Sequence, residues 1–284
     1  MRNLGRDLAD LKPAFPISIK WIGIESIDLC VPFKPIFEED LDPVYMACKF
    51  SLYCSLDKHR RGAHISRFPE ILIEESHSSP KSIFHFCKAI ADNIRKSQKQ
   101  EYGRIRLFCE HSIEKKSPIA QKPTLVPLLL GVDMMVSSSH LINEAFIEFD
   151  IITMCPCVLE MSSRVRANSG DRFVGSFSHT QRARLKLTVI DNGQIDYKKI
   201  LEVAEEVSLL VSTTLKRPDE LHLVRNAFSN PVFCEDIVRH ALVAMKHRFE
   251  VSSSETSSLK LKATIRSHES IHPFSIVATG ETRI

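Results

Sequence analysis

The sequence has no apolar run long enough to cross a membrane. Its longest apolar stretch, 125–136, contains Pro127 and Asp133, whereas a membrane-spanning helix needs about 20 predominantly apolar residues. The N-terminus also lacks the basic and then apolar pattern of a secretory signal peptide. We therefore expect a cytoplasmic protein that does not enter a membrane.

The sequence also lacks a strong excess of either charge. Its 38 Lys and Arg residues against 35 Asp and Glu residues give a formal net charge of +3. General nucleic-acid binding favours a larger basic excess, so we expect no nucleic-acid partner. Positive charge is nevertheless concentrated in "DKHRRGAHISRF" at 57–68. This stretch is most simply a basic loop, but its arginines could also hold phosphates through bidentate hydrogen bonds.

The eight cysteines do not form a regular disulfide framework. Cys155 and Cys157 lie one residue apart in "FDIITMCPCVLEM" at 149–161, a spacing that rarely allows an unstrained disulfide. Because a signal peptide is missing, we expect reduced thiols throughout the chain. Most of the remaining cysteines are expected to be small buried hydrophobic residues. They are Cys30, Cys48, Cys54, Cys87, Cys109 and Cys234.

The hydrophobic pattern predicts an α+β fold. With 284 residues and 43% hydrophobic content, the chain can bury one large domain or two ordinary ones. We expect strands at about 18–32, 43–56, 102–113, 123–136, 143–154, 173–190 and 258–271. We expect helices at about 80–98, 195–215 and 231–249. These elements suggest two modules, 1–138 and 139–284, each with antiparallel strands backed by helices.

Strand alternation predicts that Cys155 and His179 lie close together. Cys155 ends the inward row of the strand at 143–154, and His179 begins an apolar row in the next strand. If the two strands pair across a loop at 156–172, a thiolate and an imidazole would form half of a divalent-metal site. The alternative is a core cysteine beside a hydrogen-bonded core histidine.

Other candidate side chains have simpler alternatives. Glu235 shares a helix face with Val238, Leu242, Met245 and Phe249. A carboxylate buried on such a face needs a partner, although the helix N-terminus alone could stabilise it. Glu220 is expected in a loop, as a solvated salt-bridge residue. His268 and His272 lie where the last strand ends.

Six motifs carry a family resemblance. They are, in order, "RRGAHISRF", "MCPC", "SHTQR", "LKRPDE", "NPVFCEDIVR" and "ESIH", between about residues 57 and 272. This series resembles that of the type IB GTP cyclohydrolases, including their archaeal relatives. The resemblance implies two tandem tunnelling-fold modules per chain and a homotetramer. It also implies that a divalent metal helps to open the guanine imidazole ring of GTP, giving formate and 7,8-dihydroneopterin triphosphate for folate or pterin biosynthesis.

The same resemblance implies a role for particular residues. Cys155 would bind the metal, with His179, Glu220 and His272 as further metal or metal-water residues, while Cys157 receives no definite role. His179, Glu220 and His64 would be catalytic, and Glu235 would hold the guanine edge. The candidates for binding the triphosphate are the cations of two motifs, Arg60, Arg61, Arg67, Lys216 and Arg217.

The chemistry of these residue types agrees with the resemblance. A metal held by a thiolate and imidazoles lowers the pKa of bound water to about 7. A carboxylate accepts hydrogen bonds from N1–H and the exocyclic amine of guanine, which adenine does not offer. The mixed ligands suit zinc, iron(II) or manganese to different degrees.

Two features of the sequence differ from the motif pattern of the bacterial family members, and they keep alternatives open. The long spacer 158–178 and "HTQR" resemble the archaeal branch, whose product is 7,8-dihydroneopterin 2′,3′-cyclic phosphate. "PFSIV" after "ESIH" lacks a further histidine that bacterial members commonly have, so the choice between His268 and His272 stays open. A non-catalytic tunnelling-fold protein that binds a purine or pterin is the alternative from another functional class.

Overall fold

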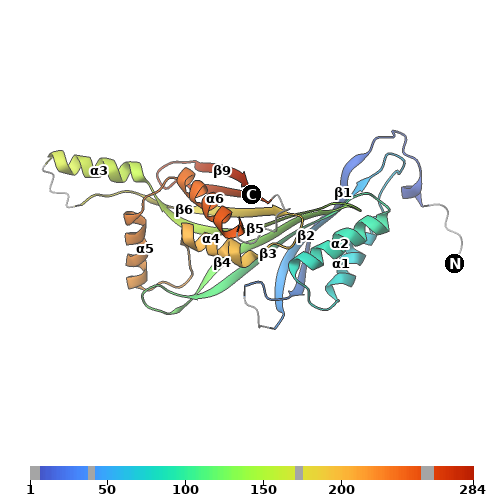
Figure 1. Ribbon diagram of the computed structural model, residues 1–284, viewed down its shortest axis with the longest axis horizontal. Coiled ribbons are helices and arrows are strands. Elements are labelled where there is room, and N and C mark those ends of the chain that lie inside the picture. Colours follow the sequence, from blue (N-terminus) through green and yellow to red (C-terminus); the bar gives the residue numbers. More distant parts are fainter. Residues whose placement is uncertain (1–6, 38–41, 170–174, 251–258) are drawn as a thin grey trace. The chain divides into compact units, whose positions relative to one another are not determined.

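The computed structural model describes residues 7–37, 42–169, 175–250 and 259–284 (Figure 1). The strands in these residues are β1 (Ile19–Phe33), β2 (Val44–Leu56), β3 (Gly103–Lys116), β4 (Pro123–Val136), β5 (Leu141–Met154), β6 (Thr180–Asp191), β7 (Leu209–Leu210), β8 (Lys260–His268) and β9 (Ser275–Arg283). The helices are α1 (Arg67–Ser76), α2 (Ile83–Gln98), α3 (Pro156–Ser169), α4 (Tyr197–Val207), α5 (Arg217–Ser229) and α6 (Cys234–Glu250), with a short 3₁₀ turn, η1 (Leu8–Asp10). None of these helices is long and apolar enough to span a membrane.

The strands of the described residues follow one another along a sheet. Their order is β1-β2-β3-β4-β5-β6-β8-β9, and β7 pairs with β5. The chain divides into unit 1, which contains Met1–Glu110, Leu130–Ala145 and Ile190–Ile195, and unit 2, which contains the rest. The boundary expected near residue 138 falls in the turn between β4 and β5, where the Ser137 N–H donates to the His140 carbonyl (2.8 Å). The two-module division at this turn stays a prediction.

The core of unit 1 lies between α2 and the buried face of β2. Alternate residues of β2 from Met46 to Leu56 are buried, as the period of a one-sided strand requires. The ring of Phe86 in α2 packs edge-on against Phe33, with 5.2 Å between ring centroids, and also contacts Phe50. Full burial of one such side chain contributes about 1.5–3 kcal/mol. These apolar contacts hold α2 against the sheet.

The core of unit 2 lies between α6 and the strands β8 and β9. Figure 1 shows α4 and α6 side by side, and both contribute fully buried residues such as Ile200 and Met245. Gly280 in β9 allows the close approach of α6, because a Cβ atom there would lie only 2.9 Å from Leu242 Cδ1 and 3.0 Å from Val238 Cγ1. Any larger residue would have to displace these side chains.

Several expected elements differ from the structure. The loop expected at 156–172 contains α3, and the loop expected around Glu220 is the first turn of α5. Both helices have a proline in their first two positions, and their apolar residues are not concentrated on one face, so hydrophobic periodicity did not reveal them. The helix expected at 195–215 ends at Val207, and the strand expected from 173 begins at Thr180. Residues 170–174 lie outside the described residues.

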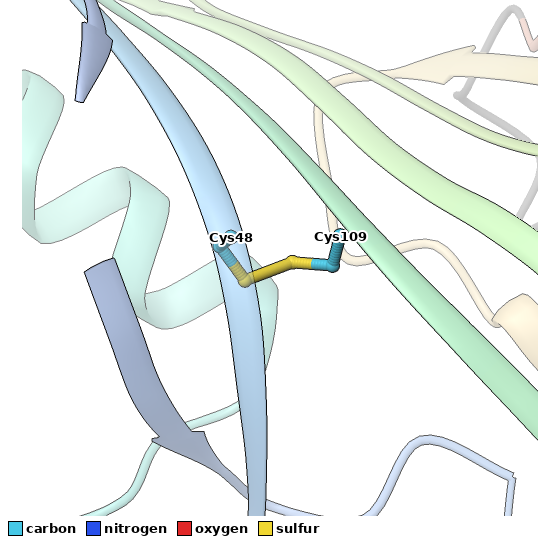
Figure 2. The surroundings of a disulfide bond; sticks show 2 residues. All are labelled: Cys48 and Cys109. Atoms are coloured by element: carbon cyan, nitrogen blue, oxygen red, sulfur yellow. A yellow bond between two sulfur atoms is a disulfide. The ribbon is translucent and has the colours of Figure 1, made fainter. Parts of the chain in front are cut away.

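One pair of cysteines contradicts the expectation of reduced thiols. Cys48 and Cys109 form a disulfide between β2 and β3, with their Cα atoms 4.4 Å apart (Figure 2). The two residues are direct cross-strand partners, a relation that sequence spacing does not reveal. Cys54 and Cys87 are free and buried as expected, and burial raises the pKa of the Cys54 thiol to about 12.

Candidate functional site

Cys155 and His179 are neighbours in unit 2. The inward row of β5, including Phe149, Ile151 and Thr153, is buried, and half-buried Cys155 follows that row. The Cys155 N–H donates to the His179 carbonyl oxygen (3.2 Å), and the hydroxyl of Ser178 donates to the Cys155 carbonyl (2.6 Å). The predicted approach of these two residues is therefore confirmed.

Cys157 lies in a different setting from Cys155. Cys155 directly precedes α3, whereas Cys157 is exposed in the first turn of that helix. The two thiols of "MCPC" thus differ in exposure, and Cys155 is the one joined to the His179 backbone.

The imidazole of His179 meets two other motif residues. Its Nδ1 lies 2.8 Å from Gln181 Oε1 and 3.1 Å from Ser270 Oγ. The Gln181 amide in turn donates from Nε2 to Glu269 Oε1 (3.4 Å). β6 and β8 are adjacent in the sheet, so "SHTQR" at the start of β6 meets "ESIH" just after β8.

The motif "NPVFCEDIVR" lies close to "ESIH" through its residue Cys234. The pKa of the buried Cys234 thiol is raised, first by burial and also by the negative charges of Glu269 and Glu235, while the nearby Ser267 side chain lowers it in part. "NPVFCEDIVR" and "ESIH" are therefore close enough to act on each other electrostatically.

Glu235 begins α6 with an exposed carboxylate. Val238, Met245 and Phe249, which share its helix face, are buried as predicted, but Glu235 itself is exposed in the first turn. In the single chain its position is therefore that of a first-turn carboxylate, which the helix N-terminus stabilises. A ligand can reach this carboxylate without opening the core.

Asp219 was missed by the sequence analysis. It is fully buried and accepts hydrogen bonds from the backbone N–H groups of Ile119 (2.8 Å), Ala120 (2.9 Å) and Lys216 (2.9 Å). Burial alone would raise the pKa of this carboxyl, but these donors outweigh it and lower the pKa to about 2. The sequence signal for this role was proline followed by aspartate at a helix start.

Asp219 therefore fixes the beginning of α5, where three of the predicted residues lie. Glu220 is the next residue along the helix, and it is exposed together with Lys216 and Arg217. The expectation that Glu220 lies in a loop is wrong, because a proline and the Asp219 cap start a helix there.

His272 and His268 are exposed near the C-terminus. The ring of His272 stacks on Phe274, with 4.9 Å between ring centroids and 7° between the planes, while His268 Nδ1 lies 3.3 Å from Ser275 Oγ. It is Glu269 and Ser270, between these histidines, that reach the His179 network.

A metal site is only partly assembled in the described residues. They contain no group of three or more His, Cys, Asp or Glu side chains placed to hold a metal ion. Cys155 and His179 nevertheless offer the sulfur and nitrogen donors that zinc and iron(II) accept, while carboxylate ligands suit manganese better. The roles of Glu220 and His272 at a metal stay predictions.

His64 in unit 1 is surrounded by the chain's own carboxylates. Its Nδ1 lies 3.0 Å from Asp7 Oδ2 and its Nε2 lies 3.4 Å from Asp10 Oδ1. Its backbone exchanges hydrogen bonds with the Gln98 side chain at 3.0 and 2.8 Å. Arg60 also pairs with Asp10, at 3.0 Å. The basic motif thus already has acidic partners in the single chain.

The segment Asp7–Leu11 is held onto this basic motif by its backbone as well. The N–H groups of Arg61 and Gly62 donate to the carbonyls of Leu11 (2.8 Å) and Ala9 (3.2 Å). Of the other predicted cations here, Arg67 donates to the carbonyl of Ser97, and the side chain of Arg61 is exposed.

Unit 2 also contains a cavity of about 690 Å³. It is bordered by β5, β7, α4, α5 and α6, and its polar lining includes Asn226, His240 and His247. Met154 of "MCPC" and Ile237 of "NPVFCEDIVR" line this cavity, whereas none of the residues predicted to bind metal or substrate does.

Solved structures with a similar fold are uricases. The uricase from Arthrobacter globiformis matches with a TM-score of 0.53 and 7% identity, covering 91% of this chain and 92% of that one. A hyper-thermostable mutant of AgUricase matches with a TM-score of 0.55, also at 7% identity, covering 92% and 91% of the two chains. At this identity the likeness concerns the fold alone. It confirms the expected α+β tunnelling fold.

The sequence comparisons identify the family. A model described as type I GTP cyclohydrolase folE2 matches residues 6–278. "GTP cyclohydrolase FolE2" of Thermosipho melanesiensis is 25% identical over 98% of each chain, and that of Thermotoga maritima is 28% identical over 97% of this chain and 96% of its own. "GTP cyclohydrolase MptA" of Methanosphaera stadtmanae is 25% identical over 96% and 93%. Since one family model spans nearly the whole sequence, the chain belongs to the type I GTP cyclohydrolase folE2 family.

Proposed function

We propose that this chain opens the guanine imidazole ring of GTP at a divalent metal held by Cys155 and His179. Membership of the family makes it a GTP cyclohydrolase of pterin or folate biosynthesis. What we propose beyond family membership is the bound metal and the residues that hold it. The observation that carries them is the hydrogen bond from the Cys155 N–H to the His179 carbonyl (3.2 Å), which makes these two residues neighbours across the backbone.

The proposed roles follow from the chemistry of each side chain. When bound, the metal would lower the pKa of its water, so that hydroxide is available to attack C8 at neutral pH. The exposed carboxylate of Glu235 accepts hydrogen bonds from N1–H and the exocyclic amine, and so selects guanine. Lys216 and Arg217, exposed at the start of α5, offer charge to the triphosphate. Glu220 and His272 complete the metal site in this proposal, and His64 acts from the substrate side.

We propose 7,8-dihydroneopterin triphosphate as the product, together with formate. The family model is the folE2 type, which supports the triphosphate. The match to an MptA protein is of similar identity, so the archaeal-type cyclic phosphate remains the second candidate. A non-catalytic purine-binding or pterin-binding protein would not need Cys155 and His179 side by side.

The assembly, location and subtype belong to the same proposal. We propose a homotetramer, as the motif resemblance implies, together with a cytoplasmic location and the narrower type IB assignment within the folE2 family. Light scattering of the purified protein tests the assembly, because a monomer at working concentration would contradict it.

The proposed reaction is tested by identifying its product. The purified protein is incubated with GTP and with zinc, iron(II) or manganese in separate samples, and the product is identified by mass. We expect 7,8-dihydroneopterin triphosphate in at least one sample. Unchanged GTP in all samples would contradict the reaction, and a cyclic phosphate would replace the proposed product by the second candidate.

A further inference from the structure

Among the described residues, the hydrogen bonds to the His179 imidazole are made at Nδ1. Its Nδ1 faces the amide oxygen of Gln181 at 2.8 Å and the hydroxyl of Ser270 at 3.1 Å. Gln181 is the second residue of β6, and Ser270 follows β8. The network therefore needs the pairing of two strands that are far apart in the sequence.

The Glu269 carboxylate determines how the Gln181 amide is turned. A carboxylate only accepts hydrogen bonds, so the Gln181 NH₂ group must face Glu269 Oε1, at 3.4 Å. The amide oxygen of Gln181 then faces His179, and this oxygen also only accepts. The proton between them must therefore belong to His179 Nδ1.

We propose that Gln181, oriented by Glu269, is a positioning residue that keeps the His179 proton on Nδ1 and leaves the Nε2 lone pair free for the metal. This inference rests on the proposed metal site at Cys155 and His179, and it adds residues to which the motif resemblance assigned no role. Ser270 Oγ, 3.1 Å from the same nitrogen, is a second acceptor for the Nδ1 proton. A metal can bind only the ring nitrogen that carries no proton, so the tautomer decides whether His179 is ready to be a ligand.

The "ESIH" motif then contributes to the metal site through residues other than its histidine. Within the described residues His272 stacks on Phe274, whereas Glu269 and Ser270 lie next to the groups that hold His179. The motif thus supports the candidate metal ligand through its first two residues.

The first test is the tautomer of His179 in the metal-free, full-length protein. Long-range proton–nitrogen NMR of histidine-labelled protein separates the two tautomers, and the His179→Ala variant identifies the signals among the 12 histidines. The experiment is run at a pH where the ring is neutral. We expect a proton on Nδ1 in the wild type and in Gln181→Glu, which keeps an acceptor. We expect a shift towards the Nε2–H tautomer in Gln181→Met, which has none.

The second test is metal affinity, measured by titrating zinc into the same metal-free proteins. Loss of such a supporting hydrogen bond typically weakens metal binding by about 10–100-fold, so Gln181→Met should lose affinity in this range and Gln181→Glu should regain most of it. Arg182→Met, on the opposite face of the same strand, is the matched control and should bind zinc like the wild type. Circular dichroism and melting curves establish that each variant is folded.

The possible outcomes separate this inference from the proposed function. An Nε2–H tautomer in the wild type would overturn the inference, as would an unchanged tautomer and zinc affinity in folded Gln181→Met. Nδ1–H in the wild type, lost in Gln181→Met together with zinc affinity, would support the inference even if GTP were not turned over. In that case only the proposed reaction would fail.

Discussion

His179 in unit 2 and His64 in unit 1 are held by partners of opposite chemistry. His179 Nδ1 faces an amide oxygen and a hydroxyl, while both ring nitrogens of His64 face carboxylates. An imidazole that meets a carboxylate at each nitrogen is best satisfied as a double donor, whereas a neutral acceptor at one nitrogen leaves the other with its lone pair. The partners, more than the residue type, make His179 suited to a metal and His64 suited to negative charge.

The predicted phosphate-binding cations of the two units differ in the same way. Arg60 is already paired with Asp10 from the N-terminal segment, but Lys216 and Arg217 are exposed at the start of α5. A triphosphate can reach the α5 cations directly. To reach Arg60 it must compete with a carboxylate of the same chain.

The largest expected effect is the loss of metal on removing Cys155. Cys155→Ala removes a proposed ligand, so bound metal and turnover should fall by more than about 100-fold, the upper end of the effect of second-shell changes. Cys157→Ala, the matched variant two residues away, should keep its metal because Cys157 is exposed in α3. Elemental analysis of purified proteins measures both. Equal metal content in Cys155→Ala and the wild type would end the ligand assignment.

The next effect concerns the guanine anchor. In Glu235→Gln one acceptor becomes a donor that faces a guanine donor, and leaving such a group mispaired costs roughly 1–3 kcal/mol, about a tenfold or greater loss of GTP affinity. Bound metal should stay at the wild-type level. Calorimetric titration measures the affinity.

Asp236→Asn is the control for Glu235, because Asp236 lies beside it and pairs with Arg239 on the surface. This variant should bind GTP like the wild type. An unchanged affinity in Glu235→Gln would reduce Glu235 to an N-terminal helix charge.

A smaller effect is expected from the acidic partners of the basic motif. Asp7→Asn combined with Asp10→Asn frees Arg60 and His64, and a surface ion pair is worth about 0.2–1 kcal/mol. If Arg60 meets the triphosphate, GTP should bind roughly one and a half to fivefold more tightly, with the gain decreasing at high salt. The control is Asp28→Asn, which breaks the exposed pair with Lys49 elsewhere in unit 1. No gain over this control would assign the triphosphate to other cations.

The last effect concerns stability instead of binding, and it is the pH dependence that arises from Asp219. Its pKa in the folded chain, about 2, lies below the ordinary value of 3.8, so ionised Asp219 stabilises the folded state above about pH 4. This contribution is lost as the pH falls towards 2. Asp219→Asn should therefore be less stable than the wild type at neutral pH, and the difference should shrink on acidification.

Denaturant unfolding of Asp219→Asn and the wild type between pH 2 and pH 7 measures this difference. Glu220→Gln, which changes the exposed neighbouring carboxylate, is the stability control and should unfold like the wild type. A constant difference between Asp219→Asn and the wild type at all pH values would contradict the account of the helix cap.

The α+β fold class and the approach of Cys155 to His179 could be predicted because they depend on local patterns. Strand alternation alone brought Cys155 and His179 together, and it also identified the buried rows of β5 and β6. The helix α3 could not be predicted in this way, because its apolar residues are not concentrated on one face.

The remaining parts depend on partners that are distant in the sequence. Gln181 and Glu269 are separated by 88 residues, and Asp219 is 100 residues from Ile119. The disulfide between Cys48 and Cys109 joins residues 61 apart through strand register. Each of these contacts exists only after the sheet has formed, so residue spacing carries no signal for it.

The central claim is that the C8 atom of guanine is removed at the Cys155 and His179 site. The most direct measurement is carbon NMR of formate released from GTP labelled with ¹³C at C8, with metal-loaded wild type and with Cys155→Ala at equal concentration. The account predicts labelled formate in proportion to the GTP consumed by the wild type, and little or none from Cys155→Ala. Absence of labelled formate from the wild type, or equal formate from both proteins, would contradict it.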